Sequence, residues 1–285
     1  MSWKATIDYD LTENQMVYGT VSTGYRGGGF SADGSLPANL LSYKPETVTN
    51  YELGWKAELL EKSMALNLTV FNMDYQDMQV SSLMLNSLNN PTVVTVNAAK
   101  SRVRGAEFEW LWRITPHDQV RGFATYLDPH FTSYPNGVDM GRSIDSIYNI
   151  AAGILGLGLV PANPPVVSLT GKSLPFAPAY TFQFGYSHIF DLGENGTLTP
   201  DIQFYWQAKT YGDIVNSVNA KRDPYHKTDF NLTYETTSSL MSVNLFIHNL
   251  ENAKVPQYGQ IKWDSISYTY NPPRTYGIRV GFKVD

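Results

Sequence analysis

The sequence contains no cysteine, and this absence excludes a disulfide framework and thiolate metal sites, although it identifies no cellular compartment. Charged residues are also scarce, because they make up 16% of the chain where about a quarter is usual. The formal net charge is −5, from 21 basic and 26 acidic residues, and no basic block occurs. The composition therefore predicts no nucleic-acid partner.

Long hydrophobic runs are missing as well. The longest apolar run, Ile150 to Val160, has eleven residues, whereas a helix that spans a bilayer needs about 20. The first residues, MSWKATIDYD, show no basic region followed by an apolar stretch, so they do not form a secretory signal. The mean hydropathy of −0.26 is typical of a soluble protein. A membrane β-barrel stays possible, because its strands are half polar.

Motifs for catalysis and metal binding are absent too. The sequence has no His-Glu-x-x-His pair and no G-x-S-x-G, so it predicts no catalytic residue, no metal site, no cofactor and no enzymatic activity. The five histidines lie on different predicted elements: His117, His130, His188, His226 and His248.

Alternation of apolar and polar residues is the main pattern that the chain does show. Near the C-terminus, Tyr276, Ile278 and Val280 alternate with Gly277 and Arg279, which is typical of a strand with one apolar face. The same pattern predicts about eleven strands, at residues 2–9, 15–25, 46–60, 64–82, 92–114, 118–131, 178–190, 197–210, 226–236, 240–250 and 274–284. The apolar parity slips near Phe71, which predicts either a bulge there or a strand that rises out of its apolar environment. The strand at 92–114 has room for a break near Ala98.

The connections between these strands alternate in length. The stretches DLTEN, LLEKS, TPHD, DLGENG and TTSS are tight turns, whereas residues 26–45, 83–91, 132–177, 211–225 and 251–273 form long loops. Repeated long loops are unusual in a compact soluble domain. They are normal in an outer-membrane barrel, which has short periplasmic turns and long outer loops. The loop at 132–177 has room for a short helix capped near Ser143.

Alternation alone also fits a soluble β-sandwich. The length of the strands, the Trp and Tyr residues near strand ends and the charged polar face favour an all-β, antiparallel, up-and-down transmembrane β-barrel. With eleven strands the first and last run in the same direction, so antiparallel pairing cannot close the barrel. Because an open edge is not tolerated in lipid, the sequence predicts part of a larger barrel.

The alternation assigns side chains to two predicted surfaces. Membrane lipid is the predicted partner of the apolar surface, whereas charged residues belong in a wet lumen, because a basic residue at the lipid midplane costs about 2–4 kcal/mol. The predicted lipid-facing residues are Tyr51, Trp55, Phe108, Trp110, Trp112, Phe204, Trp206 and Phe282. The predicted lumen-facing residues are Glu52, Lys56, Glu107, Glu109, Arg113 and Arg279.

Five stretches resemble, in order, the C-terminal part of TonB-dependent outer-membrane receptors. They are VYGTVSTGYRGGGF at 17–30, YKPETVTNYELGWKAELLEKSMALNLTVFNMDYQDMQV at 43–80, VNAAKSRVRGAEFEW at 96–110, LFIHNLENAKVPQYG at 245–259 and PPRTYGIRVGFKV at 272–284. The resemblance implies that residues 1–285 form about 11 strands of a 22-stranded barrel in the outer membrane of a Gram-negative bacterium. The family also carries a signal peptide, a coupling segment and a plug, which this chain is expected to lack. The family usually ends on an aromatic residue, where this chain has Val284 and Asp285.

The resemblance also implies a function. The complete protein is expected to bind a scarce ligand, by family default a ferric siderophore, and to admit it when the TonB energy complex acts on the missing N-terminal part. This chain alone is not expected to transport. Gly54 and Gly105, small residues on the lumen side, predict either close approach of a plug or a bulge.

Ligand contacts are expected in the outer loops, because Arg and aromatic side chains bind by charge and stacking. The candidates are Arg26, Tyr211, Tyr258, Trp263 and Tyr268, although each can also pack on its loop neighbours. Two other functions stay open. One is a passive porin-like or adhesin-like barrel assembled from two copies, and the other is a soluble carbohydrate-binding β protein.

Overall fold

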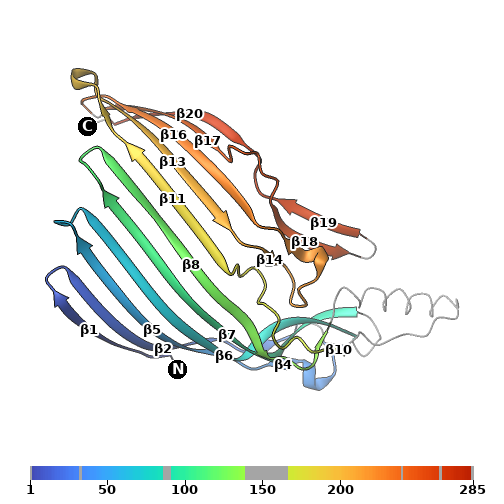
Figure 1. Ribbon diagram of the computed structural model, residues 1–285. Coiled ribbons are helices and arrows are strands. Elements are labelled where there is room, and N and C mark those ends of the chain that lie inside the picture. Colours follow the sequence, from blue (N-terminus) through green and yellow to red (C-terminus); the bar gives the residue numbers. More distant parts are fainter. Residues whose placement is uncertain are drawn as a thin grey trace.

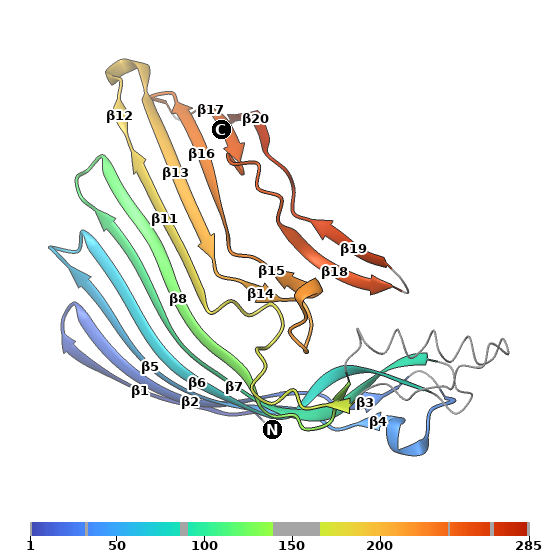
Figure 2. The same ribbon diagram turned by 45° about the vertical axis from the view of Figure 1, so that its right-hand side comes forward.

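One curved antiparallel sheet dominates the computed structural model, which describes residues 2–31, 34–85, 91–138, 166–238, 240–262 and 265–283 (Figures 1 and 2). In this described part, eleven long strands follow one another across the sheet in chain order. They are β1 (Lys4–Thr12), β2 (Gln15–Arg26), β5 (Glu46–Leu59), β6 (Met64–Leu85), β7 (Pro91–Arg113), β8 (Asp118–Ser133), β11 (Tyr180–His188), β13 (Thr197–Gln207), β16 (Tyr225–Glu235), β17 (Met241–His248) and β20 (Thr275–Phe282). Each predicted strand is present, with ends that differ by a few residues.

The two ends of the sheet differ, as Figure 1 shows. Tight turns join the strands at one end, which we call the turn end; one of them contains β12 (Phe190–Asp191) and the 3₁₀ helix η2 (Gly193–Asn195). At the other end, the loop end, the connections form small hairpins. These are β3–β4 (Gly29–Phe30 and Ser42–Tyr43), β9–β10 (Gly137–Val138 and Val166–Val167), β14–β15 (Thr210–Tyr211 and Lys221–Arg222) and β18–β19 (Pro256–Lys262 and Ser265–Tyr270), with the 3₁₀ helices η1 (Ala38–Leu40) and η3 (Val218–Ala220).

One prediction about the connections changes, and one is not tested. The loop predicted at 83–91 is shorter, because β6 continues to Leu85 and β7 begins at Pro91. The helix predicted near Ser143 lies outside the described residues, as do Val284 and Asp285. Among the residues that the structure describes, no helix is both long enough and apolar enough to cross a membrane.

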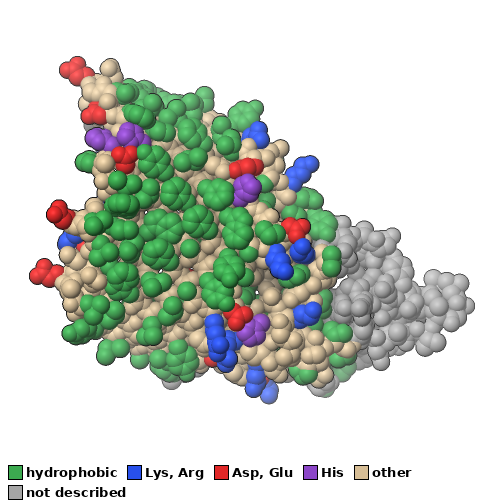
Figure 3. Space-filling view, in the orientation of Figure 1, with side chains coloured by type: hydrophobic (Ala, Val, Ile, Leu, Met, Phe, Trp, Pro, Cys, Tyr) green, Lys and Arg blue, Asp and Glu red, His purple; other side chains and the backbone are tan. Residues whose placement is uncertain are grey.

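The register gives the sheet two chemically distinct faces. The apolar face carries Leu53, Phe108 and Leu245, and the polar face carries Glu52 and Glu107; directly paired residues such as Leu53 and Val70 share a face. Leu53 is 64% exposed, so no other part of the described chain covers it. Figure 3 shows this face as an area of hydrophobic side chains with few charges in its middle. A surface of this kind needs an apolar partner.

The bulge predicted near Phe71 is wrong, because the pairing of β6 with β7 runs without a shift from Met64 to Tyr75. The register shifts instead between Tyr75 and Met78, next to Asp77, which has a positive φ of 53°. The parity slips in the sequence because β6 leaves the apolar zone, the other alternative that the pattern predicted. β7 is one continuous strand through Ala98, but the ladder shifts there, because Ala98 is an extra residue between the pairs Met78–Ala99 and Gln79–Asn97.

Aromatic rings on neighbouring strands leave no room for a side chain at Gly54 and Gly105 on the polar face. A Cβ atom on Gly54 would lie 2.1 Å from the ring of Tyr18, and one on Gly105 would lie 2.5 Å from the ring of Phe71. Both glycines lie in stretches of continuous register, so neither marks a bulge. The aromatic ring on the neighbouring strand already occupies the space above each glycine, which accounts for its small size within this chain.

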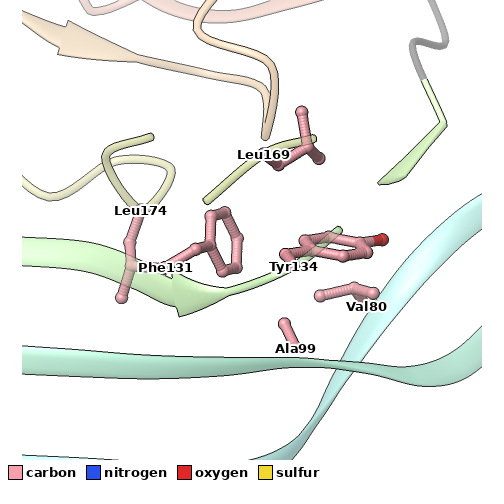
Figure 4. Close-up of a cluster of buried hydrophobic side chains, with 6 residues drawn as sticks. All are labelled: Val80, Ala99, Phe131, Tyr134, Leu169 and Leu174. Carbon is pink, nitrogen blue, oxygen red and sulfur yellow. The ribbon is translucent and has the colours of Figure 1, made fainter. Parts of the chain in front are cut away.

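A small hydrophobic core lies at the loop end. Phe131 and Tyr134 are almost fully buried, with ring centroids 5.3 Å apart, and they pack against Val80, Leu169 and Leu174 (Figure 4). Leu169 and Leu174 belong to the long connection between β8 and β11. The core therefore fastens the ends of this connection to the sheet.

Gly105→Val tests the packing of rings on glycines. The new side chain meets Phe71 and the carbonyl oxygen of Tyr126, so we expect a loss of about 1–3 kcal/mol in the free energy of unfolding. Urea unfolding followed by tryptophan fluorescence measures it. Gly27→Val is the control, because nothing lies within 4 Å of a Cβ at Gly27. Equal unfolding midpoints for the two variants would contradict the packing.

Candidate functional site

The predicted ligand-binding residues fall in two places. Tyr211 lies in β14 and Tyr268 in β19, so both belong to the hairpins between β13 and β20. Tyr258 lies in β18, paired with Thr269. Arg26 ends β2, far across the sheet from these hairpins, and Trp263 lies outside the described residues. The structure therefore groups three of the five candidates and separates Arg26 from them.

A hollow lies between the β14–β15 hairpin and the β18–β19 hairpin. Its lining includes Phe176, Lys221, Arg222, Gln257 and Tyr268. It combines two basic side chains with two aromatic rings, the combination that was expected to hold a ligand. Of the residues predicted to contact a ligand, Tyr268 contributes to the lining, whereas Tyr211 is not part of it.

Arg222 is the residue of this hollow that sequence reasoning missed. Its Nη2 atom donates to the carbonyl oxygen of Gln257 at 2.5 Å. Its Nε atom is buried and has no hydrogen-bond partner among the described residues. A buried donor without a protein partner is uncommon, and a water molecule, an ion or a ligand atom can serve as its acceptor. Lys221 and Arg222 are the one adjacent basic pair in the sequence, and that signal would have drawn attention to them.

Lys221 differs from Arg222 in having an ionic partner. Its Nζ atom lies 2.5 Å from an oxygen of Asp223, and this contact raises the pKa of Lys221 above its ordinary value. Lys221 is therefore charged at neutral pH, but Asp223 neutralises it locally. Arg222 has no ion pair within the described chain, so it supplies the uncompensated positive charge of the hollow.

Side-chain amides fasten the 27–45 connection to the sheet. The Nε2 atom of Gln79 donates to the carbonyl oxygens of Gly27 and Lys44 at 2.8 and 3.1 Å, and its backbone N–H donates to Glu46 at 2.9 Å. Asn97 accepts from the N–H of Lys44 at 2.6 Å and donates to its carbonyl oxygen at 2.8 Å. Both amides belong to stretches that carry the family resemblance, so these motifs hold a loop in place.

Asn249 has the same role at the other edge of the sheet. Its backbone N–H donates to Asp229 at 2.8 Å. Its side-chain amide donates to the carbonyl oxygen of Ala253 at 3.1 Å and accepts from the N–H of Ala253 at 2.8 Å. Glu251, two residues further on, accepts hydrogen bonds from the N–H and the hydroxyl of Thr228. Burial raises the pKa of Glu251, but these hydrogen bonds outweigh it and hold the pKa below its ordinary value.

The six predicted lumen residues share the polar face by register. Glu52 accepts from the hydroxyl of Tyr18 at 2.8 Å, and the Nζ atom of Lys56 lies 5.6 Å from the same ring. Glu109 accepts from Asn67 at 3.2 Å, and Arg279 lies over the ring of Phe246. No ion pair joins any two of the six in the part of the chain that the structure describes.

An ion pair that sequence reasoning missed crosses this face. Arg121 on β8 donates to Asp201 on β13 at 2.6 Å, over the intervening strand β11. Gly185 on β11 pairs with Arg121, and its missing side chain leaves room for the arginine. A glycine between a basic and an acidic strand position is the signal that could have found this pair.

The register puts the eight predicted lipid-facing residues on the apolar face. The ring of Trp110 lies between those of Phe108 and Phe182, with centroid distances of 5.4 and 5.9 Å. Such aromatic rows are typical of barrel walls near the membrane interfaces. Over the described residues, no cluster of three or more His, Asp and Glu side chains has a geometry that could hold a metal ion.

A curved antiparallel sheet with tight turns at one end and anchored loops at the other defines a segment of an outer-membrane-type β-barrel. The family described as TonB dependent receptor-like, beta-barrel, matches residues 1–250, and the chain belongs to this family. Receptors of this family are proteins of the Gram-negative outer membrane, which is where this chain is located.

Individual relatives agree with this assignment. The pesticin receptor of Yersinia pestis is 25% identical over 95% of this chain and 34% of its own length. The probable TonB-dependent siderophore receptor PiuA of Acinetobacter baumannii is 26% identical over 52% of this chain and 20% of its own length. The crystal structure of the ferric yersiniabactin uptake receptor FyuA from Yersinia pestis matches with a TM-score of 0.73 at 22% identity, over 97% of this chain and 36% of that one. The chain thus matches between a fifth and about a third of the length of these relatives.

Asn97→Ala tests the anchoring of the 27–45 connection. The substitution removes the acceptor of the Lys44 N–H and one of two amide donors to its carbonyl oxygen, which keeps Gln79; because both lost bonds are exposed, the cost is about 0.5–1.5 kcal/mol. We expect faster hydrogen exchange and faster proteolysis in residues 27–45. Asn67→Ala, which removes one exposed bond to Glu109, is the control. Unchanged exchange in the first variant would show that Asn97 does not anchor the connection.

Glu251→Gln tests the carboxylate near Thr228. Because the folded pKa of Glu251 lies below the unfolded one, its stabilising effect is present above the unfolded pKa and is lost as the pH falls through the folded one. Hydrogen-exchange protection of residues 249–254 should stay constant down to about pH 5 and then fall. In the Gln variant this acid-dependent fall should be absent. An identical pH profile in both proteins would exclude Glu251 as its source.

Proposed function

We propose that this chain forms part of the barrel wall of a receptor for TonB-dependent uptake of a ferric siderophore. The observation that carries the proposal is the hollow at the loop end, where the buried Nε donor of Arg222 lacks a partner among the described residues. The names of two relatives support the ligand class, because one is a probable siderophore receptor and another takes up ferric yersiniabactin.

The groups around the hollow suit one edge of a ferric chelate, because the hollow itself has a volume of only about 20 Å³. Such complexes present anionic oxygen atoms on a compact, partly aromatic framework, and a guanidinium group binds anionic oxygens through paired hydrogen bonds. Arg222 would bind an oxygen of the ligand, and Tyr268 and Phe176 would contact its framework. Arg26 and Tyr211 remain proposed contacts outside this hollow. Tyr258 and Trp263 remain proposed contacts as well.

The two faces of the sheet have separate roles in this proposal. The apolar face, with Tyr51, Trp110 and Phe282, lies against membrane lipid, and the polar face, with Glu107 and Arg279, lines the lumen. Residues 1–285 act as one portion of the barrel domain. Uptake depends on the TonB energy complex and on other parts of the complete receptor, so this chain alone neither transports nor catalyses a reaction.

The other two functions fit the structure less well. Eleven strands that alternate in direction make β1 and β20 run the same way, so two copies in one orientation would meet with parallel edges. Such edges do not continue the antiparallel ladder of a porin-like barrel. A soluble carbohydrate-binding protein would cover its apolar face with other protein, whereas Leu53 is 64% and Ile278 is 69% exposed.

Arg222→Gln tests the ligand contact in the complete receptor. Loss of a hydrogen bond from a charged group costs about 1.5–3 kcal/mol, so we expect siderophore affinity to fall about tenfold to a hundredfold. Binding is measured by quenching of tryptophan fluorescence with the ferric siderophore that supports growth of the source bacterium.

The matched control is Lys62→Gln, which also removes one positive charge but lies in a tight turn at the other end of the sheet. It should bind like the unmodified receptor. Equal affinity of the Arg222 variant would exclude the hollow as the ligand site. Growth on the siderophore that is equally good without the TonB energy complex would contradict the proposed transport.

A further inference from the structure

The hollow at Arg222 is built from three segments that lie far apart in the sequence. Phe176 comes from the connection between β8 and β11, Gly212 and Arg222 come from the β14–β15 hairpin, and Gln257 and Tyr268 come from the β18–β19 hairpin. None of these five residues belongs to the long strands of the sheet. The shape of the hollow therefore depends on the contacts that hold these segments against one another.

Asn216, at the tip of the β14–β15 hairpin, joins two of the three segments. Its Oδ1 atom accepts from the N–H of Ser173 at 2.8 Å, and its Nδ2 atom donates to the carbonyl oxygen of Ser173 at 3.0 Å. One half-buried amide thus satisfies both backbone groups of a residue 43 positions earlier in the chain. Because two hydrogen bonds meet one residue, they fix the orientation of the hairpin tip as well as its distance from Ser173.

The backbone at the hairpin tip suits an asparagine. The φ angle of Asn216 is 56°, in the left-handed region that asparagine adopts more readily than most residues other than glycine. The Nδ2 atom also lies 3.4 Å from the carbonyl oxygen of Asp213, within the same turn. Asn216 therefore turns the hairpin and reaches Ser173 with one side chain.

Hydrogen bonds continue from Asn216 to the strand that carries Arg222. The hydroxyl of Ser217 accepts from the N–H of Ala220 at 3.2 Å. The carbonyl oxygen of Ala220 in turn accepts from the N–H of Gly212 at 2.8 Å. β15, with Arg222, begins at the next residue. The hairpin tip and the arginine thus belong to one hydrogen-bonded unit.

Ser173 gives this unit a fixed point of attachment. On either side of it, the carbonyl oxygen of Lys172 and the N–H of Leu174 form hydrogen bonds of 3.0 and 3.1 Å with backbone groups of β8. Leu174 also belongs to the loop-end core, against which Ile214 and Val215 of the hairpin pack (Figure 4). Asn216 therefore connects the hairpin to a part of the chain that the sheet and the core already hold.

Phe176 forms a second connection between the same two segments. Its N–H donates to the carbonyl oxygen of Tyr211 at 2.8 Å. Its ring lies against Gly212, where a Cβ atom would be 3.5 Å from the ring. Since Phe176 follows Ser173 by only three residues, the two connections together bring the ring of Phe176 and the guanidinium group of Arg222 to one hollow.

We propose that Asn216 is a positioning residue for the ligand hollow. It holds the tip of the β14–β15 hairpin on Ser173 and so places Arg222 beside Phe176 before a ligand arrives. A site that is ordered in advance binds more tightly, because binding does not have to order its loops. The ligand contacts Arg222 and not Asn216. This inference rests on the proposed function of the hollow.

The test is a double-mutant cycle in the complete receptor, made of Asn216→Ala, Arg222→Gln and their combination. Binding is measured by quenching of tryptophan fluorescence, and the probe is the ferric siderophore that supports growth of the source bacterium. Ser173→Ala is the matched control, because Asn216 bonds only the backbone groups of Ser173, which this substitution keeps. Asn216→Gly separates the amide from backbone strain, since glycine readily adopts a positive φ but has no amide.

We expect Asn216→Ala and Asn216→Gly each to lower the affinity about tenfold, and Ser173→Ala to leave it unchanged. In the Arg222→Gln background, Asn216→Ala should change the affinity by less than about twofold, because Arg222 is the group that Asn216 positions. Without ligand, hydrogen exchange of residues 211–222 should become faster in both Asn216 variants, whereas that of β16 should stay the same.

Normal affinity of Asn216→Gly would overturn the role of the amide. Equal losses from Asn216→Ala with and without Arg222 would overturn the positioning role, because Asn216 would then act independently of the arginine. Weaker binding by Arg222→Gln together with normal binding by Asn216→Ala would also overturn it, while the proposed function of the hollow would stand. Unchanged affinity of Arg222→Gln would instead exclude the hollow as the ligand site and, with it, the effect of Asn216 on ligand binding.

Discussion

A polypeptide in lipid has no water to hydrogen-bond its backbone, so each buried N–H and carbonyl group must find its partner in the protein itself. The long strands meet this demand with an antiparallel ladder that runs unbroken, for example, from Thr47 paired with Gln76 to Leu59 paired with Met64. An unbroken ladder fixes the side-chain period at two. That period produces the two faces, and it confines irregular backbone to the two ends of the sheet.

Beyond the ends of the ladder, side-chain amides form the hydrogen bonds that the backbone groups of the connections need. Gln79 and Asn97 satisfy the backbone of the 27–45 connection, and Asn249 does the same for the connection before β20. The loop-end core around Phe131 adds apolar contacts to the same task. The outer loops therefore begin from fixed positions, and the hollow with Arg222 is a site that the fold holds in place. This anchoring links the fold to the proposed ligand contact.

The strands and their faces could be predicted because they depend on one local property, the alternation of residues that meet lipid with residues that meet water. The same alternation located the change near Phe71 but gave two explanations, and the register was needed to choose between them. Arg222 could not be recognised in this way, because its unpaired Nε atom arises only when two hairpins meet. The reason for a glycine at position 54 could not be predicted either, because the ring of Tyr18 that fills the space belongs to another strand.

The opposite environments of the two faces are the central claim, and the absence of cysteine makes them directly measurable. Single cysteines at successive positions from 51 to 57 of β5, each carrying a nitroxide spin label, report contact with oxygen in lipid and with a water-soluble nickel complex. In the receptor in lipid bilayers, we expect oxygen contact to be highest at Leu53 and Trp55 and nickel contact to be highest at Glu52 and Lys56. A profile without this period of two, or nickel contact at every position, would contradict the account.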